Sequence, residues 1–147
     1  MNRKLWSIAR KLGVFVIPLV FVAVTVPTVL AYAYDGTDPH TTGCDLNAFT
    51  PASRSAGGGT LELRFSRSCL TGWARFTCWN SGGCTNYTLW IVRSNDGKQE
   101  IQHVTWPATT PYGASLYTNQ LNDSGSLVST ACYQGYFGAP KYCTASY

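Results

Sequence analysis

Six cysteines, all placed after an apolar N-terminal leader, constrain this chain more than any other feature. They are Cys44, Cys69, Cys78, Cys84, Cys132 and Cys143. An even number of cysteines in an exported chain indicates disulfides, and six cysteines allow fifteen pairings. Zinc is disfavoured because the sequence has no C-x-x-C spacing and exported proteins fold in an oxidising compartment. The sequence therefore predicts a small disulfide-bonded domain without a metal.

Residues 1–33 have the three parts of a secretory signal peptide. Two basic pairs precede a mainly apolar run over residues 12–26, and residues 31–33 read Ala-Tyr-Ala, a small-x-small cleavage site. We therefore expect secretion, cleavage after Ala33 and one mature extracellular domain over 34–147, which meets the membrane only transiently through its leader. The alternative is a membrane anchor formed by residues 12–33, which are just long enough to span a bilayer.

The positive charge of the chain belongs to the leader. The whole chain carries a formal charge of +4, but residues 34–147 contain seven basic and seven acidic side chains. Nucleic-acid binding requires a basic patch that neutralises phosphates. A nucleic-acid partner is therefore not expected.

Short alternating segments predict a fold built from strands. Residues 61–66 alternate strictly between apolar and polar side chains, as in a half-buried strand. Further strands are expected over 73–79, 85–93, 99–106, 115–119, 126–134 and 141–146, separated by turns rich in Gly, Asn, Asp and Pro. Residues 34–51 and 54–59 are expected to be irregular. The sequence predicts one all-β domain, an antiparallel sandwich or a small, partly closed barrel.

The expected hairpins favour one set of disulfides. One pair of cysteines flanks the turn at residues 80–83, another flanks the last turn, and the two that remain would hold the N-terminal segment to the sheet. The favoured bonds are Cys44–Cys69, Cys78–Cys84 and Cys132–Cys143.

The sequence offers few combinations of residues that are typical of a catalytic site. No Gly-x-Ser-x-Gly motif is present. His40 lies in a turn with Asp38 and Asp45 nearby, and His103 lies in a strand on the face opposite Val104. A general base needs an orienting carboxylate and a nucleophile, and no serine motif supplies the nucleophile. A small secreted hydrolase using His40 or His103 is therefore an alternative function.

The acidic residues have structural explanations beside chemical ones. Glu62 and Glu100 are the only glutamates, and paired carboxylates hydrolyse glycosides. However, a cross-strand ion pair between Glu62 and Arg75 explains Glu62 structurally. Asp35, Asp38, Asp45 and Asn47 offer oxygen ligands for calcium, but Asx turns explain these residue types equally well.

Aromatic residues near turns are the most suggestive group. Trp79, Trp106, Tyr136 and Phe137 lie at predicted loop ends, where rings stack on sugars or anchor a protein partner. The alternative is that these rings pack over a small hydrophobic core. We expect a secreted, non-enzymatic binding module for an extracellular polymer or protein, without a cofactor. A secreted inhibitor or toxin-associated protein is a further alternative.

Three stretches resemble a family of small secreted proteins, mainly actinobacterial, known as domain of unknown function 2690. They are residues 36–39 with 42–44, residues 61–66 with Cys69 and 73–75, and residues 122–123 through 131–132. The resemblance spans most of the chain after the leader, and its middle stretch is the most specific. It implies export and a compact β-rich domain, and it implies no activity.

The chain departs from the family pattern in its cysteines. Many members have a cysteine just before the Gly-x-Asp-Pro turn, where this chain has Tyr34 and Asp35. If that cysteine pairs with the equivalent of Cys132, then Cys143 is its replacement here. This departure supports the local pairing, which a bond from Cys132 to Cys44 or Cys69 would contradict.

Overall fold

The computed structural model of the chain describes residues 33–105, 107–136 and 138–147. Within these residues the regular elements are nine strands and no helix. They are β1 (Phe49–Ala56), β2 (Gly59–Ser66), β3 (Thr71–Cys78), β4 (Tyr87–Arg93), β5 (Gln99–Val104), β6 (Ser115–Tyr117), β7 (Leu121–Asn122), β8 (Ser129–Gln134) and β9 (Lys141–Cys143). The expected all-β class is confirmed.

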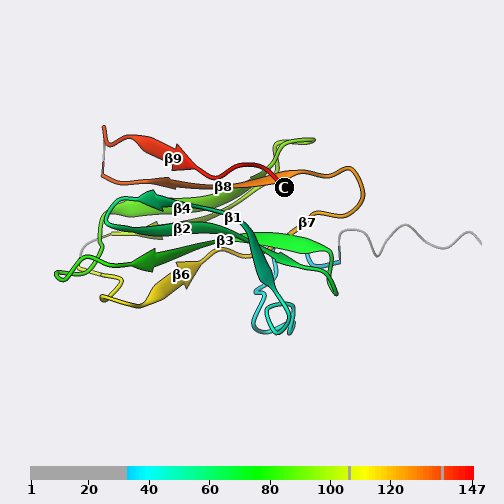
Figure 1. Cartoon of the computed structure of the whole chain (residues 1–147), viewed down its shortest axis with the longest axis horizontal. Coiled ribbons are helices and arrows are strands. Elements are labelled where there is room, and N and C mark those ends of the chain that lie inside the picture. The colour runs from blue at the N-terminus through cyan, green and yellow to red at the C-terminus, as the bar shows by residue number, and fades with distance from the viewer. Residues whose placement is uncertain (1–32, 106, 137) are drawn as a thin grey trace, which may run out of the picture.

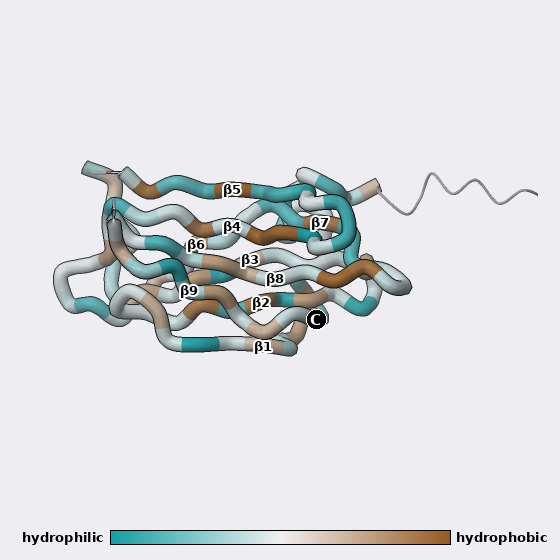
Figure 2. The backbone as a smooth tube through the Cα atoms, turned by 90° about the horizontal axis from the view of Figure 1, so that it is seen from above, coloured by the Kyte–Doolittle hydropathy of each residue, from teal (hydrophilic) through white to brown (hydrophobic). Residues whose placement is uncertain are grey.

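The strands form two antiparallel sheets. The first sheet has the order β1-β2-β3-β6, with β7 also pairing with β3, and the second has the order β5-β4-β8-β9. The sheets lie as two layers (Figure 1), and strands of both layers run along the same long axis (Figure 2). This is the aligned packing of a β sandwich. In the described residues neither sheet closes into a barrel.

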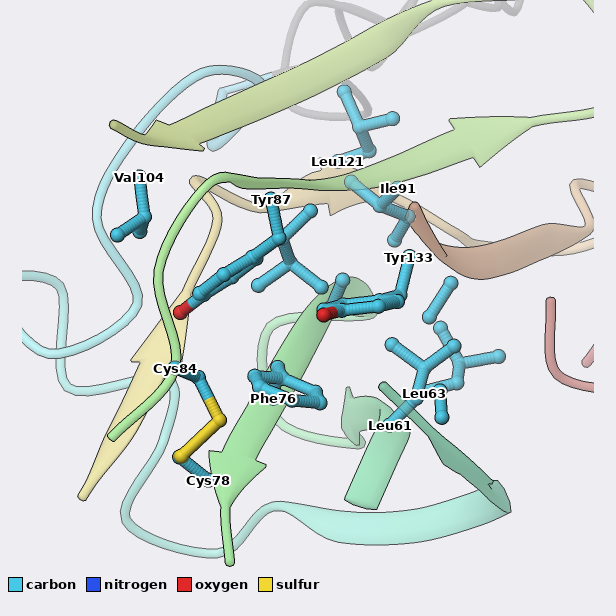
Figure 3. Packing of buried hydrophobic residues seen from close by; sticks show 14 residues of the cluster. Leu61, Leu63, Phe76, Cys78, Cys84, Tyr87, Ile91, Val104, Leu121 and Tyr133 are labelled. Atoms are coloured by element: carbon cyan, nitrogen blue, oxygen red, sulfur yellow. A yellow bond between two sulfur atoms is a disulfide. The ribbon is translucent and has the colours of Figure 1, made fainter. Parts of the chain in front are cut away.

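The core lies between the two sheets and is rich in aromatic rings. Phe76 of β3 stacks on Tyr133 of β8, with ring centroids 4.5 Å apart, and Tyr133 stacks on Tyr87 of β4 at 5.2 Å. Figure 3 shows these rings beside Leu61 and Leu63 of β2. In β2 and β4 the buried residues occupy alternate positions, so one side of each of these strands faces the core.

All six cysteines form disulfides, and the bonds are those that the hairpins favour. Cys44 is bonded to Cys69, Cys78 to Cys84, and Cys132 to Cys143. The first bond ties residues 33–48, hereafter the N-terminal segment, to the turn between β2 and β3. Disulfides persist in oxidising compartments, so three of them indicate an extracellular type of environment.

The structure corrects the expectation for the region before β2. Residues 54–59 form the end of β1, a tight turn and the start of β2, where an irregular loop was expected, and β1 itself begins within the supposedly irregular 34–51. Arg54 is paired with Leu61 and so occupies an inward position of the edge strand. This charged residue interrupts the apolar alternation that would have indicated a strand.

Several other strands are shorter than expected. The strand predicted over 126–134 begins at Ser129, and the one predicted over 141–146 ends at Cys143. Residues 144–147 still continue the pairing, because Ser129 and Tyr147 exchange two backbone hydrogen bonds.

The leader is almost wholly outside the described residues. The signal peptide expected over 1–33 and the alternative anchor over 12–33 fall there, apart from Ala33. Within the part of the chain that the structure describes, no helix is long and apolar enough to cross a membrane.

Candidate ligand-binding grooves

The outer face of the first sheet carries a row of polar and aromatic side chains. In β3, Ala74, Phe76 and Cys78 point into the core, so Arg75 and Thr77 point outward. Trp79 continues this outward row just beyond β3, because its backbone N–H still donates to the Gly58 carbonyl at 2.9 Å.

Trp79 is a large ring held in place at the surface. Its side chain is 51% exposed. The indole Nε1–H donates to Oγ1 of Thr60 at 3.0 Å, which fixes the orientation of the ring. Tyr112 lies edge-on to the indole with a centroid distance of 5.8 Å and is itself exposed. Two exposed rings therefore lie beside each other, and the hydrogen bond to Thr60 fixes one of them.

An open groove of about 530 Å³ runs past Trp79 and over the β1–β2 turn, and we call it the aromatic groove. Its aromatic lining is formed by Trp79 and Tyr142. Arg54 lies over the Tyr142 ring at 5.3 Å and donates to the Cys143 carbonyl at 3.0 Å. The groove is lined by Ser55, Ala56, Gly57, Gly58, Gly59, Thr60, Trp79 and Tyr142.

Glycines form the floor of the aromatic groove because side chains do not fit there. A Cβ on Gly59 would collide with the Thr77 carbonyl and the Phe76 ring, and one on Gly57 would collide with the Tyr133 ring. Gly57 also has a positive φ of 53°, which favours glycine. The close approach of this turn to the core leaves a hollow lined partly by backbone.

A second, smaller groove of about 220 Å³ lies at the same end of the second sheet. His103 and Tyr136 line it, together with Asn86, Tyr87, Thr88, Val104, Thr105 and Gly135. Nδ1 of His103 makes a 3.0 Å hydrogen bond with Oγ1 of Thr88, and Tyr136 is 73% exposed. As expected, His103 faces outward while Val104 is buried.

The expected binding residues are therefore divided between two grooves. Trp79 belongs to the aromatic groove and Tyr136 to the smaller one. Trp106 and Phe137 lie outside the described residues. Sequence reasoning did not select Tyr112 for binding, nor the glycine floor. The run of three glycines before β2 was the available signal for the floor, but it indicated only a flexible loop.

The expected ion pair between Glu62 and Arg75 is confirmed. The two residues are cross-strand partners, and the Arg75 guanidinium donates to both carboxylate oxygens at 2.6 and 2.9 Å. Oγ1 of Thr50 also donates to Glu62 at 3.0 Å. Partial burial alone would raise the pKa of Glu62, but the hydrogen bonds and charge of Arg75 hold it below its ordinary value.

His40 has an orienting carboxylate. Its Nδ1 contacts the Asp45 carboxylate directly, and its ring meets the Tyr117 ring edge-on with centroids 4.7 Å apart. Burial and the nearby carboxylates of Asp38 and Asp45 raise the pKa of Tyr117. Among the described residues, no serine, threonine or cysteine side chain makes a hydrogen bond to His40. The pair supplies two of the three groups that a nucleophilic site uses.

The acidic residues considered for calcium are engaged within the chain. Asp38 accepts the backbone N–H groups of His40 and Thr41 in an Asx turn. Asp35 forms a buried ion pair with Arg93. In the described ranges, no three His, Cys, Asp or Glu side chains are grouped in a way that could hold a metal ion.

The fold and its grooves define a class: a small, two-sheet, disulfide-bonded β protein with a fixed aromatic ring beside an open groove. The chain belongs to the family described as "Protein of unknown function (DUF2690)", which matches residues 32–132. The matched region ends at Cys132, so the partner of this cysteine, Cys143, lies beyond it. No curated protein and no solved structure matches the chain.

Proposed function

We propose that this protein is secreted and acts as a non-enzymatic module that binds an uncharged glycan, with Trp79 as the main contact. The observation that carries the proposal is the Trp79 indole, which is half exposed yet fixed by its hydrogen bond to Thr60. A ring that is already ordered loses little conformational entropy when a ligand stacks on it. Sugar rings present C–H groups that pack on such an aromatic face.

The rest of the aromatic groove suits a hydroxyl-rich ligand. Ser55 and Thr60 supply hydroxyl groups beside Trp79, and the glycine floor lets a ligand approach the backbone. The polar groups needed for orientation are thus mixed with apolar ring faces, as in ligand sites generally.

The charges at the groove do not favour a charged polymer. Arg54 borders the groove at Tyr142, and its guanidinium is already engaged with the Tyr142 ring and the Cys143 carbonyl. No acidic side chain lines the groove in the described residues. A neutral glycan therefore fits better than an anionic polymer or a basic peptide.

Export is the second part of the proposal. The leader-like sequence over 1–33 and the three disulfides both support it. Export would bring the grooves into contact with extracellular polysaccharides.

The test is a binding comparison made with protein expressed from the whole chain, leader included, with its disulfides oxidised. Depletion on insoluble cellulose and chitin is measured first, and calorimetry with soluble β-1,4-linked glucose and N-acetylglucosamine oligomers follows. We expect binding to at least one series and at least about a tenfold loss in Trp79→Ala, equivalent to about 1.4 kcal/mol. Thermal unfolding of the variant should stay close to that of the parent.

Two control variants sharpen the test. Trp90 lies on the outer face of the second sheet, under Lys141 at 5.1 Å, so Trp90→Ala should leave glycan binding unchanged. Tyr136→Ala separates the two grooves, and a loss in this variant with none in Trp79→Ala would move the site to the smaller groove. The proposal fails if no glycan binds, if a single protein is held in stoichiometric amount instead, or if Trp79→Ala unfolds the protein. Hydrolysis of the oligomers that depends on His40 or His103 would establish the alternative enzyme.

A further inference from the structure

The outer face of the first sheet extends the binding surface away from Trp79. The register pairs Thr77 of β3 with Ser115 of β6, and Arg75 with Tyr117. These two pairs and Trp79 follow one another on the same face, because outward residues alternate along a strand. A ligand leaving the Trp79 ring along β3 would meet a hydroxyl pair, then an arginine beside a tyrosine.

The row has a defined length. Successive outward residues of a strand lie about 6.7 Å apart, so Trp79 and Arg75 are separated by about 13 Å. This is longer than one sugar ring and within the reach of a short oligosaccharide. Thr77 and Ser115 share a 2.7 Å hydrogen bond and are solvent accessible, so both hydroxyl groups can bind a further partner.

The far end of the row is closed by the N-terminal segment. Beyond Arg75, the outward side chains of Trp73 and Thr71 are buried, with Trp73 only 3% exposed. Gln120 accepts a hydrogen bond from Thr71 at 2.6 Å and donates to Thr37 and Thr42 of the segment at 2.9 Å. His40 of the same segment lies against Tyr117. The open part of the face therefore runs from Trp79 to the His40–Tyr117 contact and stops there.

The charged groups along the row are already matched. Arg75 is bonded through two nitrogens to Glu62, and His40 contacts Asp45. A charged ligand would compete with these pairs, whereas an uncharged ligand can accept and donate hydrogen bonds around them. The charge pattern therefore favours an extended neutral ligand over an acidic polysaccharide or a charged protein surface.

From these observations we infer that the row Trp79, Thr77–Ser115 and Arg75–Tyr117 is a binding track for several consecutive units of an uncharged glycan chain. The inference rests on the proposed function and names its substrate class, an extended oligosaccharide lying along β3. The ring at Trp79 binds one unit, the hydroxyl pair binds the next, and Tyr117 with His40 ends the track.

Affinity as a function of chain length tests the track. The protein, expressed from the whole chain and oxidised, is titrated with β-1,4-linked glucose and N-acetylglucosamine oligomers from the dimer to the hexamer. For the series that binds, the affinity should rise with length and then reach a plateau once the chain spans the row. The double variant Thr77→Val, Ser115→Ala should weaken binding of the hexamer by about 25-fold, since each of the two hydroxyl contacts raises the affinity by about fivefold. The dimer should be affected much less.

A matched pair of hydroxyls on the opposite sheet provides the control. Thr130 and Ser146 share a 2.8 Å hydrogen bond on the outer side of the second sheet. Thr130→Val with Ser146→Ala makes the same chemical change there and should leave every affinity unchanged. Affinity that is independent of length, or a hexamer affinity unaffected by the Thr77–Ser115 variant, overturns the track. If Trp79→Ala still abolishes binding in that case, the proposed function stands without the track. If no oligomer binds at all, both fail.

Discussion

The two ends of the β sandwich use their polar side chains in different ways. At one end, Arg93 and Asp35 form an ion pair whose side chains are 1% and 5% exposed. At the other end, Trp79 and Tyr112 lie exposed beside hydroxyl groups and a glycine floor. The buried end fixes the chain, and the open end leaves ring faces and hydroxyls available for a ligand.

The buried end also explains how the N-terminal segment is held. Asp35 lies near the start of the segment and accepts hydrogen bonds from Arg93 and from the backbone N–H of Asn122, and it forms an ion pair with Lys98 at 3.1 Å. The Cys44–Cys69 disulfide fixes the other part of the segment. Because the segment closes one end of the outer face, the buried charges set the length of the surface that stays open.

The largest expected effect comes from breaking the buried ion pair. Arg93→Met removes the guanidinium that also donates to the Asn122 carbonyl at 3.0 Å and to Asp96 at 2.6 Å. The variant leaves the Asp35 carboxylate buried with less compensation, so the free energy of unfolding should fall by about 3–5 kcal/mol. Urea denaturation measures the change.

A double variant separates the loss of the pair from damage to packing. Asp35→Leu with Arg93→Met removes both charges, and it should be more stable than Arg93→Met alone. If the two variants are equally unstable, the loss of stability in Arg93→Met comes from altered packing around residue 93. The buried charges would then distinguish the two ends of the molecule less than the ion pair suggests.

The second prediction concerns Asp123, which is buried at the same end as Arg93. Neither of its carboxyl oxygens has a hydrogen-bond partner among the described residues. Burial raises the pKa of Asp123 to about 6, and the charge of Arg93 opposes the rise only partly. The folded state thus binds the proton more tightly than the unfolded chain.

The sign of the resulting pH dependence follows from this difference. The contribution of Asp123 to stability is fully present below its unfolded pKa of about 3.8 and is lost as the pH rises through about 6. The amide of Asp123→Asn does not ionise, so this variant does not lose stability as the pH rises. Between pH 3 and pH 8 its free energy of unfolding should therefore rise by about 3 kcal/mol relative to that of the parent. Urea denaturation across this range measures the gap, and a constant gap would show that Asp123 does not titrate in this way.

The open end was easier to predict from the sequence than the buried end. Strict alternation over residues 61–66 set the facing of Glu62, and the neighbouring strand then supplied Arg75 as its partner. Trp79 comes directly before a Gly-rich turn, and the sequence therefore predicted that its ring lies at a loop end. These patterns involve residues close in sequence or on neighbouring strands, and the structure contains both the ion pair and the exposed Trp79 ring.

The buried end depends on contacts that no local pattern reveals. Asp35 and Arg93 are 58 residues apart in sequence. Asp35 resembled a turn residue, and Arg93 resembled the polar end of a strand, so neither suggested a buried pair. At the open end, too, one residue hid a strand: Arg54 concealed β1, because an edge strand allows a long charged side chain at an inward position to reach the rim and pack on Tyr142.

The smallest expected effect on stability is at the Glu62–Arg75 pair, which lies on the open outer face. The Arg75 side chain is about one-third exposed, so water screens the pair, in contrast to Arg93 and Asp35. Glu62→Gln should lower the free energy of unfolding by about 1 kcal/mol or less at pH 7. Because the pKa of Glu62 is lowered in the folded state, its contribution is present above the unfolded pKa of about 4.5 and is lost as the pH falls. Urea denaturation at pH 7 and pH 3 should therefore show the small difference only at pH 7. A loss as large as that of Arg93→Met would mean that the open face is as strongly fixed by its charges as the buried end, and the contrast between the two ends would no longer hold.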